Sequence, residues 1–159
     1  MASTLGREEK EVLTAHLARH GLKRSAQREV ILEAFLRTGR HVSVEELLRI
    51  VRRRRADIGR TTIYRSLKLF KDAGLASELT YGAEARFETL WNRDHHDHFI
   101  CGSCGEIFEF KSPEIEQIQE RIARGIGFEI EGHRHHILGL CRKCVAKTSS
   151  SSRSSSSRA

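Results

Sequence analysis

The residues of this chain that could do chemistry are concentrated in one short run, from Asp94 to Cys104. The run holds three of the nine histidines, two carboxylates and two of the four cysteines. Imidazole nitrogens, carboxylate oxygens and thiolates bind transition metals in proteins, because each offers a lone pair to the ion. The run therefore predicts a metal-binding segment rather than a polar surface loop.

All four cysteines fall in two C-x2-C pairs, Cys101 with Cys104 and Cys141 with Cys144. Two such pairs are typical of a tetrahedral zinc site with four thiolate ligands. The alternative is a pair of disulfides, which would need an oxidising compartment. Because the sequence shows no apolar signal segment, we expect the zinc site.

The histidines of the run are spaced to serve two faces of a strand. Side chains alternate between the faces of an extended strand with period two. His96 and His98 would therefore share one face, and His95 and Asp97 would share the other. This spacing predicts that one strand contributes ligands to two metal sites, back to back.

The positive charge of the chain lies in its first half. Residues 1–80 hold 17 Lys and Arg against 10 Asp and Glu, whereas residues 81–159 hold 11 of each. This asymmetry indicates a polyanion-binding first half and a neutral, ligand-binding second half. No run of eighteen apolar residues is present, so we expect a soluble, cytoplasmic protein with no membrane span.

Apolar residues of the first half recur at helical spacing, and capping and stop signals divide them into separate helices. The third helix begins with a capping box, in which Ser43 is followed three residues later by Glu46. The expected helices cover residues 7–20, from Ser25 to near Gly39, from Ser43 to about Arg55, and 61–73.

A hairpin is predicted after the last of these helices. Leu79–Tyr81 and Arg86–Glu88 have the alternation of strands, and residues 82–84 supply the turn. Short helices in a basic segment followed by a hairpin indicate a winged helix-turn-helix, whose last helix enters the major groove of DNA. There Arg65 could donate two hydrogen bonds to guanine, and Tyr64 could contact a thymine methyl or a phosphate. The residues of this helix expected to contact DNA are Thr61, Thr62, Tyr64 and Arg65.

The second half predicts a small α+β unit. Its expected elements are strands over 95–100, 106–110 and 128–140, with a helix opening at Pro113 before the last strand. Along that last strand, His133 and His135 would share a face while His136 faces away.

We therefore expect an α+β protein with two domains. The winged helix-turn-helix DNA-binding domain would cover 1–90, a linker 91–93, and an α/β metal-binding domain 94–147. The remaining residues, 148–159, form a tail with eight serines and two arginines from Ser149 on. A segment of this low complexity is predicted to be disordered.

A winged helix followed by H-H-D-H and two C-x2-C pairs resembles the ferric uptake regulator family of bacterial metal-dependent repressors. The resemblance runs from about Gly21 to Cys144. The motifs that carry it are His41-Val42-Ser43-Val44-Glu45-Glu46-Leu47, Thr61-Thr62-Ile63-Tyr64-Arg65, Arg86-Phe87-Glu88, the run from His95 to Cys104, and Cys141-Arg142-Lys143-Cys144.

The resemblance implies a homodimer joined through the metal-binding domain, three metal sites and an operator DNA partner. It implies a structural Zn2+ on Cys101, Cys104, Cys141 and Cys144. It implies a regulatory site of His41, Glu88, His96, His98 and Glu109, and a second site of His95, Asp97, Glu116 and His133. Lys23, by the same similarity, would reach the minor groove beside Tyr64 and Arg65 in the major groove.

This distribution of ligands predicts a mechanism. His41 belongs to one domain and His98 to the other, with Glu88 near the joint. An ion bound by all of them would set the angle between the domains, and in a dimer that angle sets the spacing of the two recognition helices. Ion binding would then select the conformer that binds DNA, and DNA would tighten ion binding equally.

The regulatory ligands are nitrogen and oxygen donors, since the four cysteines are used by the structural site. Such a set suits Fe2+ or Mn2+, and we expect ferrous iron, although zinc binds more tightly than iron at most such sites. Within the family, the alternatives are a zinc, manganese or peroxide sensor.

An alternative from another class is a metallohydrolase or a metal-storage module. No nucleophile and base stand apart from the expected ligands, and a basic first half has no evident catalytic use. We therefore expect a regulator that is not an enzyme and takes no small organic substrate.

Overall fold

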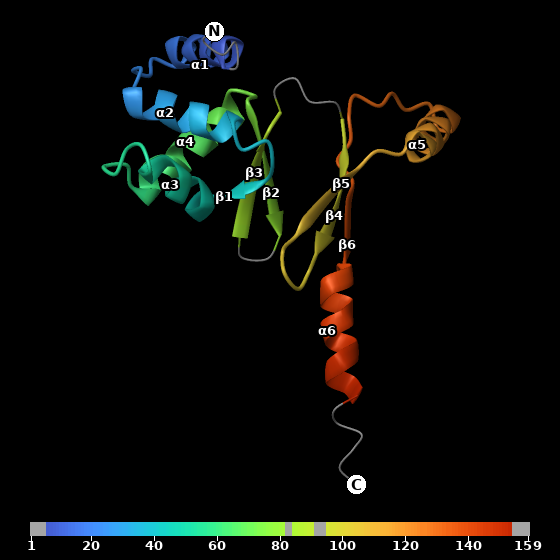
Figure 1. Cartoon of the computed structure of the whole chain (residues 1–159). Coiled ribbons are helices and arrows are strands. Elements are labelled where there is room, and N and C mark those ends of the chain that lie inside the picture. The colour runs from blue at the N-terminus through green and yellow to red at the C-terminus, as the bar shows by residue number, and fades with distance from the viewer. Residues whose placement is uncertain (1–5, 82–83, 91–94, 154–159) are drawn as a thin grey trace. The chain divides into compact units, whose positions relative to one another are not determined.

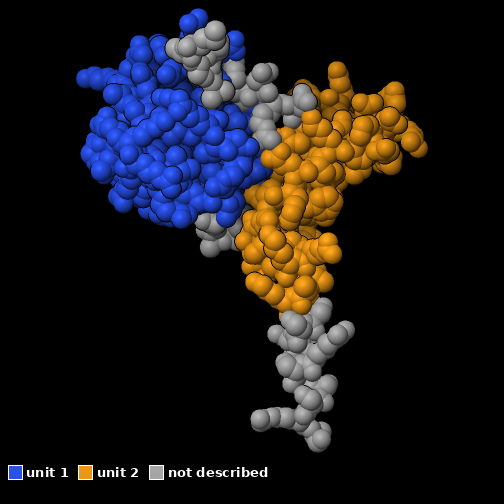
Figure 2. Space-filling model, in the orientation of Figure 1, with its two compact units in different colours: residues 1–93 blue, residues 94–159 orange. Residues whose placement is uncertain are grey.

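The computed structural model describes residues 6–81, 84–90 and 95–153. The chain divides into two compact units, residues 1–93 and residues 94–159, which are coloured separately in Figure 2. Within the described residues, no helix combines the length and the apolar character needed to cross a membrane.

The helices of the first unit follow the sequence prediction to within a residue or two at most ends. They are α1 (Arg7–Arg19), α2 (Ala26–Leu36), α3 (Val44–Arg52) and α4 (Arg60–Asp72) (Figure 1). The helix α4 buries one apolar face, made by Ile63, Leu67 and Phe70.

The predicted capping box at the start of α3 is present. The Ser43 hydroxyl accepts a hydrogen bond from the Glu46 N–H at 3.2 Å, and the Glu46 carboxylate accepts one from the Ser43 N–H at 2.9 Å. Burial opposes ionisation of Glu46, but the Ser43 N–H and the guanidinium of Arg40 outweigh it and hold the pKa of this carboxyl below its usual value. Arg86 of the following hairpin also contacts the carboxylate, at 3.3 Å.

The predicted wing is confirmed as a hairpin of β2 (Ala76–Tyr81) and β3 (Glu84–Thr89), whose turn residues 82–83 lie outside the described residues. A two-residue strand, β1 (Val42–Ser43), pairs with the other edge of β3 and completes an antiparallel sheet in the order β1-β3-β2. Two residues are too few to show strand alternation, so β1 could not be recognised from sequence.

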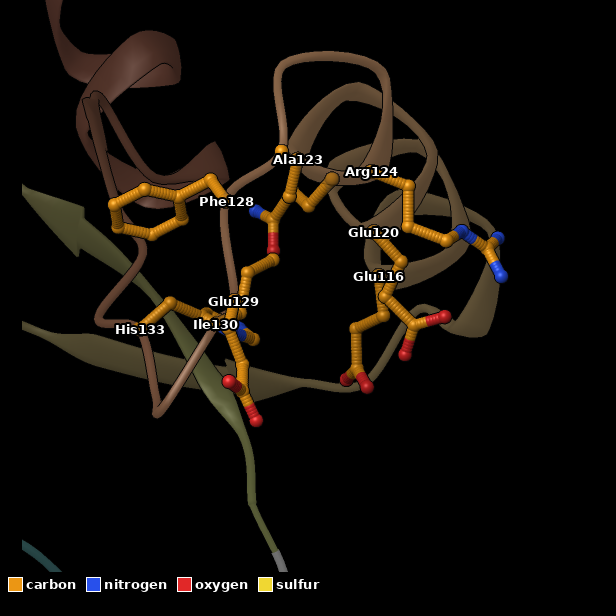
Figure 3. A pocket seen from close by; sticks show the side chains of 10 residues that line it. Glu116, Glu120, Ala123, Arg124, Phe128, Glu129, Ile130 and His133 are labelled. Atoms are coloured by element: carbon orange, nitrogen blue, oxygen red, sulfur yellow. The ribbon is translucent and has the colours of Figure 1, made fainter.

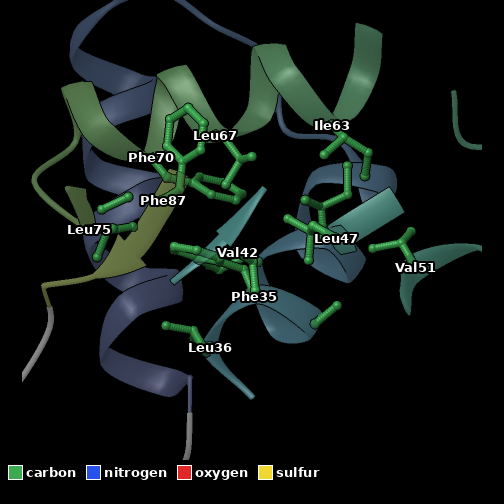
Figure 4. Packing of buried hydrophobic residues seen from close by; sticks show 14 of the residues in the cluster. Phe35, Leu36, Val42, Leu47, Val51, Ile63, Leu67, Phe70, Leu75 and Phe87 are labelled. Atoms are coloured by element: carbon green, nitrogen blue, oxygen red, sulfur yellow. The ribbon is translucent and has the colours of Figure 1, made fainter. Parts of the chain in front are cut away.

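An apolar core holds the first unit together. Phe35 of α2, Phe70 of α4 and Phe87 of β3 are fully buried, and the rings of Phe35 and Phe70 stack with centroids 6.2 Å apart (Figure 4). Burying each aromatic side chain of this kind contributes roughly 1.5–3 kcal/mol. Because Phe87 comes from the wing, the same core fixes the hairpin against the helices.

The second unit contains β4 (Asp97–Cys101), β5 (Ile107–Phe110), α5 (Pro113–Gly125), β6 (His136–Gly139) and α6 (Arg142–Arg153). Its sheet has the order β5-β4-β6, in which β4 pairs antiparallel with β5 and parallel with β6. Among its described residues, few apolar side chains are buried, notably Ile100 and Ala123. The unit therefore has little apolar core of its own.

One expectation for this unit was wrong in extent. The strand predicted over 128–140 is limited to β6, because only His136–Gly139 finds a partner strand in β4. Of the tail predicted over 148–159, residues 148–153 continue α6, whereas residues 154–159 and the linker predicted over 91–93 lie outside the described residues. The second C-x2-C pair spans the first turn of α6, where the N–H groups of Cys144 and Val145 donate to the Cys141 carbonyl.

We predict that Ser43→Ala lowers the free energy of unfolding by about 1 kcal/mol, because the hydroxyl that caps α3 is lost. Ser25→Ala is the matched control, since Ser25 stands at the N-terminus of α2 but makes no capping hydrogen bond through its side chain. Denaturant unfolding of the two variants measures the difference. Equal losses would show that the capping box does not stabilise α3.

Candidate metal centres

The four cysteines converge at one end of the sheet of the second unit. Cys101 ends β4, Cys104 follows in the turn, and Cys141 and Cys144 flank the start of α6. One sulfur from each lies within 4.8 Å of the others, and the Cys104 and Cys141 sulfurs are 3.7 Å apart. We call these four residues the cysteine cluster. All four are free thiols, and the disulfides considered from sequence are not formed.

Backbone amides prepare the cysteine cluster for negative charge. The Cys141 N–H donates to the Cys101 sulfur at 3.2 Å and, with the Cys104 N–H, lowers the pKa of Cys101 to about 6. The Glu106 N–H acts in the same direction on Cys104, but the neighbouring sulfurs of Cys101, Cys141 and Cys144 outweigh it and raise the pKa of Cys104 to about 12. Four sulfurs this close can all ionise only around a cation, so the donor set fits a tetrahedral Zn2+ site.

A second group surrounds Asp97, whose side chain is 2% exposed. Its Oδ1 lies 3.3 Å from Nε2 of His95 and 3.6 Å from Nε2 of His133. Neither Oδ1 of Asp97 nor Nε2 of His133 has a hydrogen-bond partner, although both atoms are buried. Buried polar atoms without partners are costly. This group therefore fits a cation that would satisfy them.

Glu116, the remaining residue predicted for the second site, lies outside that group. It comes from α5 and, together with His133, lines a cavity of about 550 Å³ (Figure 3). The carboxylates of Glu120 and Glu129 line the same cavity. The membership of Glu116 in a second metal site remains a prediction.

Sequence reasoning did not assign a function to His135, although it placed this residue on the same face as His133. Its Nδ1 is buried without a hydrogen-bond partner and lies 3.7 Å from Oδ2 of Asp97. We call Asp97, His95, His133 and His135 the Asp97 cluster. Three imidazoles thus surround one buried carboxylate.

The opposite face of the same sheet carries three residues predicted for the regulatory site. In the register of β4 and β5, His98 stands opposite Glu109. The rings of His96 and His98 are 4.9 Å apart, and Nε2 of His96 lies 3.9 Å from Oε1 of Glu109. Asp97 and His98 are consecutive in β4 and contact different groups of side chains, as the alternation of a strand predicts.

The first unit brings together the other two residues predicted for the regulatory site. The pairing of Val42 with Phe87 places His41, just before β1, opposite Glu88 of β3. Nε2 of His41 lies 3.4 Å from Oε2 of Glu88, and both side chains are buried. The five predicted ligands therefore form two compact groups, one in each unit.

The residues predicted to contact DNA are accessible in the first unit. Thr61, Tyr64 and Arg65 are exposed on α4, Thr62 is half-buried there, and Lys23 is exposed before α2. On α4, Lys68 and Lys71 donate to the carboxylate of Glu78 in β2, at 2.9 and 2.7 Å. Hydrogen bonds from Lys71 and Lys68 hold the pKa of Glu78 below its usual value, so the ion pairs that join α4 to the wing persist at neutral pH.

Comparisons with known proteins agree with this arrangement. The model of the ferric uptake regulator family matches residues 19–138. The chain is 36% identical over 130 residues to the ferric uptake regulation protein of Campylobacter jejuni, covering 80% of this chain and 83% of that protein. It is 31% identical over 137 residues to the peroxide-responsive repressor PerR of Staphylococcus epidermidis, covering 86% and 90%.

Among solved structures, the ferric uptake regulator of Helicobacter pylori is similar with a TM-score of 0.80 at 31% identity. The match covers 90% of this chain and 95% of that one. That protein is described as having three functional metal binding sites.

We predict that Cys104→Ser abolishes the binding of zinc at the cysteine cluster and unfolds the second unit. Structural zinc contributes on the order of 10 kcal/mol or more of folding free energy, which the sparse apolar core of this unit cannot replace. Zinc analysis and circular dichroism measure both effects, with Ser103→Ala in the same turn as the control. A folded Cys104→Ser chain that keeps its zinc would refute the structural role.

Proposed function

Because the chain belongs to the ferric uptake regulator family and is a metal-dependent transcriptional regulator, we propose that it is a repressor that binds operator DNA as a homodimer in response to Fe2+. It acts on the chromosome in the cytoplasm and controls genes of iron uptake. The observation that carries the proposal is the presence of one buried ligand pair, His41 with Glu88, in the first unit and a second ligand group around His98 in the other.

We assign all five residues to one regulatory site. His41 and Glu88 hold one side of it, and His96, His98 and Glu109 hold the other. A bound ion supplies a positively charged centre that both groups can share. The two units are joined by few residues after Glu88, so sharing one centre restricts their relative orientation. In a dimer, the orientation determines whether two recognition helices reach half-sites about one helical turn apart.

The choice of Fe2+ rests on the chemistry of the five side chains. Three imidazoles and two carboxylates form a nitrogen and oxygen set that suits Fe2+ or Mn2+, and the cysteines stand in a separate cluster. Zn2+ binds more tightly than Fe2+ to most such sets. A manganese, zinc or peroxide sensor is therefore the alternative on the same scaffold. The similarity to the peroxide-responsive repressor PerR supports the last of these.

DNA recognition is assigned to α4 and the segment before α2. Arg65 reads guanine in the major groove, and Tyr64 contacts a thymine methyl or a phosphate. Thr61 and Thr62 approach the backbone at the start of the helix, where the N–H groups also favour phosphate. Lys23 reaches the adjacent minor groove. The net positive charge of residues 1–80 adds a contribution that depends on salt and not on sequence.

The homodimer is supported by an apolar face on α5. Ile118, Ile122 and Ile126 recur every four residues at that helix and its end and are 48%, 61% and 75% exposed. Phe128 follows and is 64% exposed. Such a stripe is unfavourable in water. We assign it to contact with a second copy of the chain, which would also supply apolar burial that the second unit lacks.

A gel shift with promoter duplexes, ion by ion, tests the proposal. Wild-type protein with its cysteine cluster loaded should bind a specific duplex with Fe2+, lose it on chelation, and regain it when Fe2+ is returned. Equal binding by loaded and stripped protein would refute the mechanism. A response to Mn2+ or Zn2+ at the concentrations found in the host, with none to Fe2+, would assign the chain to another sensor class.

We predict that Arg65→Ala weakens operator binding by about 1–3 kcal/mol and relaxes base preference at one position of each half-site. The matched control is Arg19→Ala, which removes the same charge from the exposed last turn of α1. Titrations against the operator and single-base variants measure both effects. Identical losses in the two variants would reduce Arg65 to a non-specific phosphate contact.

We also predict that His98→Ala abolishes the metal-dependent part of DNA binding and leaves the fold intact. The substitution removes one imidazole from the group of His96, His98 and Glu109, while the cysteine cluster remains. Metal-dependent gel shifts and thermal unfolding measure the two quantities, and His20→Ala on α1 is the control. Wild-type metal response in His98→Ala would exclude this residue from sensing.

A further inference from the structure

The Asp97 cluster contains one imidazole more than the proposed second metal site uses. His95 and His133 both approach Oδ1 of Asp97, at 3.3 and 3.6 Å. His135 approaches the other oxygen, Oδ2, at 3.7 Å. The three histidines are therefore divided between the two oxygens of a carboxylate that is 2% exposed.

The backbone explains why His135 stands there. The β6 strand begins at His136, which pairs with His98 of β4. The N–H of His98 donates to the carbonyl of His135 at 3.1 Å, which holds residue 135 beside the start of β4. Because side chains alternate along a strand, His135 then lies on the face of Asp97, whereas His136 lies on the face of His98. The ring contact between His98 and His136, with centroids 5.6 Å apart, agrees with this.

A hydrogen bond between His135 and Asp97 would satisfy a buried polar atom of His135. Nδ1 of His135 is buried and has no hydrogen-bond partner. A neutral imidazole that carries its proton on Nδ1 can donate to Oδ2 of Asp97. The separation of 3.7 Å would have to shorten by about 0.8 Å to reach an ordinary hydrogen bond, which a small rotation of either side chain can supply.

We propose that His135 is a positioning residue of the second metal site: its Nδ1–H holds Oδ2 of Asp97, so that Oδ1 is directed at the space between His95 and His133. This inference rests on the second metal site that the family resemblance implies and that the donors around Asp97 fit. Carboxylates that bind metals are commonly oriented by hydrogen bonds to their other oxygen. His135 thus acts on the ion through Asp97 and is not itself a ligand.

Titration with Co2+ tests the role. The background is the full chain with zinc in the cysteine cluster and with Glu88→Ala and Glu109→Ala, which weakens the regulatory site without altering β4. Co2+ bound by imidazole and carboxylate gives weak visible bands. Co2+ that displaces zinc from the cysteines instead gives an intense thiolate charge-transfer band. Absorption therefore reports which site fills, and it does so independently of DNA binding.

Three substitutions distinguish positioning from packing. His135→Leu keeps the volume but removes the donor, and we expect a loss of affinity for Co2+ of about 10- to 100-fold. His135→Asn places an amide N–H where Nδ1 stands, and we expect it to restore most of the affinity. His136→Leu, the neighbouring histidine on the other face, should bind Co2+ as the background chain does.

The outcomes separate this inference from the proposed second site. Unchanged affinity in His135→Leu overturns the inference, and so does an equal loss in His135→Asn and His135→Leu. If the background chain with His135 intact binds no Co2+ outside the cysteine cluster, the second site itself is refuted and the inference falls with it. Thermal unfolding of each variant shows whether a loss of affinity for Co2+ is caused by misfolding. If His135→Leu is misfolded, the affinity of His135→Asn for Co2+ decides whether the inference holds.

Discussion

The arrangement of the second unit depends on the closure of its sheet by the cysteine cluster. Cys101 ends β4 and Cys141 follows β6, and the Cys141 N–H bonds to the Cys101 sulfur. The adjacent Gly102 N–H donates to the Gly139 carbonyl at 2.8 Å. A cation bound by the four sulfurs would hold the ends of these two parallel strands at one register. A shift by one residue would exchange the faces of Asp97 and His98 and mix the two ligand groups.

The two units are stabilised by different means, and this difference suits a metal-dependent regulator. The first unit has a core of fully buried aromatic and aliphatic side chains that includes Phe35, Phe70 and Phe87. It can present α4 in a fixed geometry, because Glu78 also ties that helix to the wing. The second unit buries few apolar side chains, and in our proposal it depends on metal and on a second copy of the chain. Metal then acts where the protein has least stability of its own.

One strand, β4, supplies side chains to three chemically distinct environments. Asp97 faces the imidazoles of the Asp97 cluster, His98 faces His96 and Glu109, and Cys101 enters the cysteine cluster. The alternation of a strand keeps the first two apart although they are neighbours in sequence. The proposed role of His135 extends this logic, because the pairing of β6 with β4 assigns His135 and His136 to opposite faces.

The sequence by itself determined the helices of the first unit, the wing, the cysteine cluster and the two faces of β4. Each depends on local spacing: helical periodicity, the Ser43 capping box, C-x2-C pairs and strand alternation. Only the tertiary structure decided the limits of β6, the pairing of β1 with β3 that sets His41 opposite Glu88, and the approach of His135 to Asp97. These depend on which strand finds a partner and in what register. Strand pairing depends on which distant segments form backbone hydrogen bonds with each other, and local residue spacing does not determine this.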